Sequence, residues 1–239
     1  GDRVFRETVL DGAVLTRVAA SHLRVGTMQW AAAHRDVDAL RALADYTRRR
    51  HYPELADGPD SGLALLEAII DRQARLVAQW QLVGFIHGVM NTDNMALSGE
   101  TIDYGPCAFM DHYDPATVFS SIDTGGRYAY GNQPAVAEWN LARLAEAMLP
   151  LIDARQERAV ERATASLARF TTAFEQDWLS GMRAKLGLFT AEPGDRALVD
   201  DLLAWMRRSA ADYTNTFRAL STPARVAAWR ASDPAFAAW

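Results

Sequence analysis

Two short polar segments hold the residues of this chain that are best suited to chemistry. The first begins at His87 and ends in Asp93-Asn94, and the second contains Asp103. Asn94 offers an amide oxygen and Asp103 a carboxylate, and Mg²⁺ is a hard cation that prefers oxygen ligands. A short β-hairpin predicted at about residues 95–103 separates the two side chains and can bring both to one metal ion. The sequence therefore predicts a Mg²⁺ site that phosphate oxygens complete.

These residues also have plainer interpretations. Asp-Asn pairs often cap turns, so Asp93 could serve only to stabilise its own loop. A lone histidine in such a loop is more often structural than catalytic, and His87 is interpreted as holding the loop. The carboxylate of Asp103 at hairpin distance favours the catalytic interpretation of Asp93.

The elements that must position these segments are mostly helices. Apolar residues at three- and four-residue spacing predict a long buried helix over residues 63–86, directly before the first polar segment. Ser21 is the predicted N-cap of a helix that ends at His34. Further helices are predicted over residues 36–51, 133–151, 153–186 (one or two helices), 195–208 and 212–220. Residues 14–18 predict a short strand or an extended linker. The predicted fold class is mainly α (α+β), with one small hairpin at the metal site.

Composition limits the class of protein. The 239 residues, 49% of them hydrophobic, suffice for one large domain or two small ones, and the net charge of −5 argues against a nucleic-acid binder. Cys107 is the only cysteine, which excludes an intramolecular disulfide and a zinc cluster and favours a reducing, cytoplasmic compartment. The apolar stretches are too short or too interrupted to span a membrane. Lys185 is the only lysine.

The order of these parts resembles that of protein-kinase-like enzymes. In those enzymes a long helix leads to a catalytic loop that ends in Asn, and Asp-Phe-Gly follows; here the second motif is Asp103-Tyr104-Gly105. The resemblance implies that residues 1–239 form part of a kinase-like large lobe. Its parts would be a lobe-connecting segment (1–20), a catalytic core (21–150) and a C-terminal helical part (151–239). Val89 stands where kinases place their catalytic acid and cannot take a proton, so either the base has moved to Asp93 or the chain is inactive as a kinase.

Longer motifs make the resemblance more specific. They are His87-Gly-Val-Met-Asn-Thr-Asp-Asn-Met95, Thr101-Ile-Asp-Tyr-Gly-Pro106, Tyr128-Ala-Tyr-Gly-Asn-Gln-Pro134, Leu15-Thr-Arg-Val-Ala-Ala-Ser-His-Leu-Arg-Val-Gly26 and Trp80-Gln-Leu-Val-Gly-Phe85. These motifs resemble the selenoprotein O (YdiU) family, and the similarity is dense from about Gly12 to Pro150.

The resemblance implies a kinase fold that binds ATP in a flipped orientation and transfers AMP to Ser, Thr or Tyr hydroxyls of proteins. Asp93 would be the proton acceptor. Asn94 and Asp103 would hold Mg²⁺, with Mn²⁺ as an alternative, and Asp103 would also contact the nucleotide. Arg17 and Arg24 would grip the displaced phosphates, which suits the forked, charge-assisted hydrogen bonds of arginine.

The departures from this pattern leave alternatives. The chain has no Gly-x-Gly-x-x-Gly segment, and Lys185 lies in a predicted C-terminal helix. The kinase small lobe, with its glycine-rich loop and paired lysine, is therefore expected to be absent, and the chain by itself is expected to be inactive. One alternative is a catalytically inactive, kinase-like binding module (a pseudokinase). A weaker one is a small-molecule kinase that transfers the γ-phosphate.

Overall fold

Helices make up most of the chain in the computed structural model, which describes residues 3–5, 8–14 and 16–239. The helices are α1 (Val25–Ala33), α2 (Val37–His51), α3 (Ser61–Val83), α4 (Gln133–Ile152), α5 (Gln156–Leu167), α6 (Arg169–Leu186), α7 (Asp195–Arg208), α8 (Tyr213–Leu220), α9 (Pro223–Ser232) and α10 (Pro234–Ala238). The strands are β1 (Arg3–Phe5), β2 (Val9–Asp11), β3 (Phe85–Ile86) and β4 (Ala108–Phe109), and the 3₁₀ turns are η1 (Thr92–Asn94) and η2 (Tyr130–Asn132). The strands pair antiparallel, β1 with β2 and β3 with β4. The predicted mainly α class with a small antiparallel sheet is confirmed.

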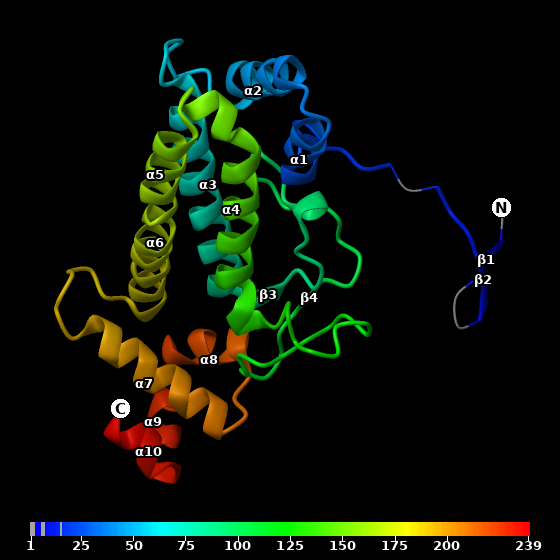
Figure 1. Cartoon of the computed structure of the whole chain (residues 1–239). Coiled ribbons are helices and arrows are strands. Elements are labelled where there is room, and N and C mark those ends of the chain that lie inside the picture. The colour runs from blue at the N-terminus through cyan, green and yellow to red at the C-terminus, as the bar shows by residue number, and fades with distance from the viewer. Residues whose placement is uncertain (1–2, 6–7, 15) are drawn as a thin grey trace.

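Helices α3 and α4 form the centre of the helical body (Figure 1). Helices α5 and α6 cover one side of this pair, α1 and α2 lie on the other side, and α7 to α10 close the lower end. The N-terminal segment that carries β1 and β2 leads away from the body. The first polar segment lies next to α1, because its 3₁₀ turn η1 contacts that helix.

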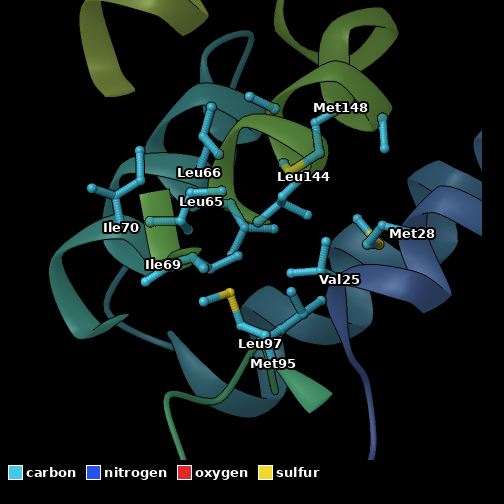
Figure 2. Packing of buried hydrophobic residues seen from close by; sticks show 14 of the residues in the cluster. Val25, Met28, Leu65, Leu66, Ile69, Ile70, Met95, Leu97, Leu144 and Met148 are labelled. Atoms are coloured by element: carbon cyan, nitrogen blue, oxygen red, sulfur yellow. The ribbon is translucent and has the colours of Figure 1, made fainter. Parts of the chain in front are cut away.

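One buried apolar cluster joins these helices to the polar segments (Figure 2). Its labelled members are Val25 and Met28 of α1, Leu65, Leu66, Ile69 and Ile70 of α3, Met95 and Leu97, and Leu144 and Met148 of α4. Burying each such side chain stabilises a fold by about 1.5–3 kcal/mol. Since Met95 and Leu97 lie between the two polar segments, the core that assembles the helices also fixes this part of the site.

The long helix differs from the prediction at its end. Helix α3 stops at Val83, and Gly84 follows with a φ of 71°, in the left-handed region that glycine adopts without strain. The predicted last turn, up to Ile86, is therefore wrong, and Phe85 and Ile86 form strand β3 instead. The chain consequently enters the first polar segment from a strand.

The predicted hairpin over residues 95–103 is reduced to a single bridge between Met95 and Thr101. The reason is a competing partner for the same backbone. The amide of Leu97 donates to the carbonyl of Leu23 at 2.8 Å, and Ala96 forms a bridge with Arg24. The segment thus pairs with the residues before α1, and the two-stranded sheet in this region is that of β3 and β4.

The other boundaries follow the prediction with two further corrections. Helix α1 begins at Val25 with Arg24 as its N-cap, so the predicted capping role of Ser21 is wrong. The Ser21 hydroxyl instead lies 2.7 Å from Nε2 of His51. The region 153–186 divides into α5 and α6 at Ala168. Leu15 lies outside the described residues, and the remaining described residues of 14–18 form no strand.

No helix in the described part of the chain combines the length and apolar character needed to cross a membrane.

Lys185 links the end of α3 to α8. Its ammonium group donates to the carbonyl of Leu82 and lies 3.7 Å from the ring centroid of Phe217. Burial lowers the pKa of Lys185 from 10.5 to about 8. Because the unfolded chain keeps the ordinary pKa, it binds more protons than the folded chain between about pH 8 and 10, and stability is expected to rise with pH in this window. The buried Tyr130 and Tyr213, whose pKa values are raised by burial, stay protonated over the same range in the folded state.

We expect Lys185→Met to flatten this rise, because the variant has no ammonium group to deprotonate. The measurement is the free energy of unfolding in urea at pH 7.5 and pH 9.5 for both proteins. An equal change with pH in the wild type and the variant would show that Lys185 titrates normally in the fold.

Candidate functional site

The loop after β3 keeps its shape through hydrogen bonds between its own side chains and backbone. Oδ1 of Asn91 accepts from the amide of Asp93 at 3.0 Å, and the Asn94 side-chain nitrogen donates to the carbonyl of Val89 at 2.9 Å. Asn91, rather than Asp93, is therefore the residue that caps η1. Within the described residues the exposed Asp93 carboxylate makes no hydrogen bond, and the amide oxygen of Asn94 is available to a ligand.

His87 connects this loop to the second polar segment. Its side chain is completely buried, and Nε2 lies 2.7 Å from the carbonyl oxygen of Ile102, the residue before Asp103. Burial lowers the pKa of His87, so the ring is neutral and Nε2 carries the proton that it donates to this carbonyl. Nδ1 then accepts from the amide of Val89 at 3.3 Å. His87 has the structural role that the sequence indicated.

Asp103 occupies an uncommon backbone conformation beside Arg17. Its φ of 60° is left-handed, a region that aspartate tolerates better than most residues. A guanidinium nitrogen of Arg17 lies 3.6 Å from Oδ1 of Asp103, and the two side chains are 40% and 37% exposed. Residues far apart in the sequence thus meet, and a cationic group lies next to a carboxylate that could bind a metal.

Arg24 lies beside the first polar segment. Its guanidinium donates to the carbonyl of Asp93 at 3.3 Å, while its buried Nε makes no hydrogen bond within the described residues. The two arginines therefore lie on different parts of the site, Arg17 at Asp103 and Arg24 at Asp93. Their predicted role in gripping phosphates stays a prediction.

Gly26, in the first turn of α1, allows Asp93 to lie against that helix. A Cβ atom on Gly26 would overlap Oδ1 of Asp93 and lie 3.0 Å from its Cγ. The N-terminal turn of a helix favours a nearby negative charge. This glycine was not predicted as part of the site, although it is the last residue of the motif that begins at Leu15.

Two buried amide side chains of α4 support the loop from behind. Gln133 accepts from the amide of His87 and donates to the carbonyl of Phe85, both at 2.9 Å. Asn140 donates to the carbonyl of Met90 at 2.9 Å. Both residues are fully buried, and the sequence signal that could have revealed them is a polar residue on the apolar face of the predicted helix.

Asn94 and Asp103 are the candidate oxygen ligands for a metal ion. Within the described residues no group of three or more His, Cys, Asp or Glu side chains could hold a metal ion alone. Asn94 and Asp103 can supply an amide oxygen and a carboxylate. Mg²⁺ commonly takes one or two protein ligands and completes its octahedron with phosphate oxygens and water. The chemistry of these two oxygen donors is therefore compatible with Mg²⁺.

Comparison with known proteins identifies the family of this chain. The family model described as protein adenylyltransferase SelO matches residues 1–237. The chain belongs to the SelO family. It is 64% identical over 222 residues to the protein nucleotidyltransferase YdiU of Halalkalibacterium halodurans, a match that covers 92% of this chain and 45% of that protein. Similar proteins with the same printed name, from Brevibacillus brevis and Shouchella clausii, are 62% and 61% identical over 221 residues, which cover 92% of this chain and 45% and 46% of those proteins. The predicted family resemblance is confirmed, and the chain spans somewhat less than half the length of these SelO relatives.

We predict that Gly26 and Asp93 are energetically coupled. In the wild-type background Gly26→Ala should lower stability, because the new methyl group must displace the Asp93 carboxylate. In the Asp93→Ala background the same change should raise stability by about 0.5–1 kcal/mol, since alanine is the better helix former and the obstacle is gone. Urea unfolding of the four proteins measures this coupling.

Gly58→Ala is the matched control, because a Cβ atom there meets nothing within 4 Å. Its effect should be the same in both backgrounds. If Gly26→Ala also has the same effect in both, Asp93 does not lie against α1.

Proposed function

We propose that this chain carries the catalytic site of a protein adenylyltransferase, which transfers AMP from ATP to Ser, Thr or Tyr hydroxyls of proteins. Family membership supports nucleotidyl transfer, and the observation that carries the proposal to this chain is the contact of Arg17 with Asp103. An arginine, which can bind phosphate, beside a carboxylate, which can hold a metal ion, suits a triphosphate better than it suits an uncharged ligand. The kinase-like large lobe is part of the proposal, as is a cytoplasmic location, which rests only on the single cysteine.

In this proposal the site grips the triphosphate through three side chains. Asn94 and Asp103 would hold Mg²⁺ or Mn²⁺, which when bound neutralises charge on the phosphates. Asp103 would also contact the nucleotide. Arg17 would exchange its contact with Asp103 for the displaced phosphates. This exchange costs little, because an ion pair as exposed as this one is worth about 0–1 kcal/mol.

In the proposed transfer step, Asp93 accepts the proton of the attacking hydroxyl. The hydroxyl oxygen of the protein substrate forms a bond to the α-phosphorus of ATP, and the bond from that phosphorus to the bridging oxygen of the β-phosphate breaks. Pyrophosphate leaves, and the hydroxyl proton passes to the Asp93 carboxylate. The exposure of Asp93, and its lack of hydrogen bonds within the described residues, support access of a protein hydroxyl to this group.

The test distinguishes the role of Asp93 as the proposed base from the role of Asp103 as the proposed metal ligand. Transfer of labelled AMP is measured in a full-length protein, in which this chain replaces the matching segment of the Halalkalibacterium halodurans relative, together with calorimetric titration of Mg-ATP. Asp93→Ala should lower the transfer rate by about 10²–10⁴-fold and leave Mg-ATP affinity nearly intact, because only the proton acceptor is lost. Asp103→Ala should weaken both.

Asp38→Ala is the control, since Asp38 pairs with Arg41 on the exposed face of α2. It should change neither quantity. Full transfer in Asp93→Ala would show that another group takes the proton. Mg-ATP binding without transfer in the wild type would favour the alternative of an inactive, kinase-like binding module.

A further inference from the structure

Arg17 lies on a segment that has no regular structure of its own. The described residues between β2 and Val25 form neither helix nor strand. Within them, no backbone hydrogen bond to the helical body is made on the N-terminal side of Ala20. The position of Arg17 therefore depends on the first point at which the chain is attached to the body.

That attachment point is Ala20, whose backbone is held on both sides by charged side chains. Its amide donates to the two carboxylate oxygens of Glu100 at 3.3 and 3.2 Å. Its carbonyl accepts from Nε and a terminal nitrogen of Arg50 at 3.2 and 2.9 Å. The amide and the carbonyl of Ala20 belong to two successive peptide groups, and since both groups are held, the backbone cannot rotate freely at this residue. Three residues of chain extend to at most about 10 Å, so Arg17 stays within that reach of Ala20.

Glu100 also contacts the turn that precedes Asp103. It lies in the turn between Asn94 and Asp103, and its carboxylate accepts from the Ser98 hydroxyl at 2.7 Å. One carboxylate thus connects the segment that carries Arg17 to the turn between Asn94 and Asp103. Arg72 supports the same turn, through a hydrogen bond of 3.4 Å to the carbonyl of Ser98.

We infer that Glu100 and Arg50 are positioning residues for phosphate binding, which clamp Ala20 and so set Arg17 opposite Asp103. This inference rests on the proposed function. Neither residue is expected to touch the substrate, since their polar atoms are directed to the backbone of Ala20. The two side chains hold the two peptide groups that flank the Cα atom of Ala20, and the consequence is the affinity for the triphosphate.

The clamp is tested by separating the binding of phosphate from the binding of adenosine. In the full-length protein described above, Glu100→Ala and Arg50→Met should each raise the KM for ATP about three- to tenfold, because each loses charged but solvent-exposed hydrogen bonds. The kcat and the affinity for adenosine should stay close to the wild-type values. Glu100→Gln keeps an acceptor oxygen for the Ala20 amide and should recover most of the lost affinity.

Arg49→Met is the matched control, because Arg49 is the exposed neighbour of Arg50 on α2. It should leave the KM unchanged. A KM within twofold of the wild type in both Glu100→Ala and Arg50→Met overturns the inference. So does a uniform loss of kcat and adenosine affinity, which would indicate general damage to the fold.

A second measurement does not depend on activity. Hydrogen exchange at the Ala20 amide, followed in this chain alone, should be faster in Glu100→Ala than in Arg49→Met. Unchanged exchange overturns the clamp even if AMP transfer is found. If the wild type transfers no AMP but exchange at Ala20 does accelerate, the proposed function has failed and the clamp itself stands.

Discussion

The buried hydrogen bond between His87 and the carbonyl of Ile102 is the constraint on which the site depends. It joins the start of one polar segment to the residue before Asp103, where no water competes for the bond. Burial keeps the imidazole neutral, so one tautomer satisfies Ile102 with its donor and Val89 with its acceptor. A charged ring would need a partner for a second N–H, and the backbone amide of Val89 cannot provide one. This bond therefore ties the start of the first polar segment to the residue before Asp103.

Buried amide side chains on helices α3 and α4 also hold backbone carbonyl groups near the site. Gln73 donates to the carbonyl of Ala96 at 2.7 Å, and Gln81 donates to that of Tyr130 at 2.6 Å. Gln133 and Asn140 do the same for β3 and the following loop. A loop packed against an apolar core has carbonyl groups without regular partners, and leaving one unsatisfied costs about 1–3 kcal/mol. The helices therefore supply the donors that the carbonyl groups of the irregular segments need.

The side chains proposed to contact the substrate have weaker and more exposed interactions than the buried residues that support the loop. The contact between Arg17 and Asp103 is half exposed, and Asp93 is open to solvent. This exposure lowers the cost of exchanging the ion pair for a phosphate. A buried ion pair at this place would have to be broken at a large cost before a phosphate could enter, whereas an exposed pair is exchanged at a small one. The rigid part of the site thus lies in the backbone, and the exchangeable part lies in the charged side chains.

The sequence by itself determined the helical class, the position of α3 and the family, because helical periodicity and dense motifs are local signals. It also indicated Asp93, Asn94 and Asp103, since their chemistry is readable from residue type and spacing. Only the tertiary structure showed that residues 95–97 pair with the segment before α1, because a backbone partner distant in sequence replaced the local hairpin. The contacts of Gly26 with Asp93, and of Glu100 and Arg50 with Ala20, likewise appear only in the tertiary structure, because they join distant segments and no local pattern encodes them.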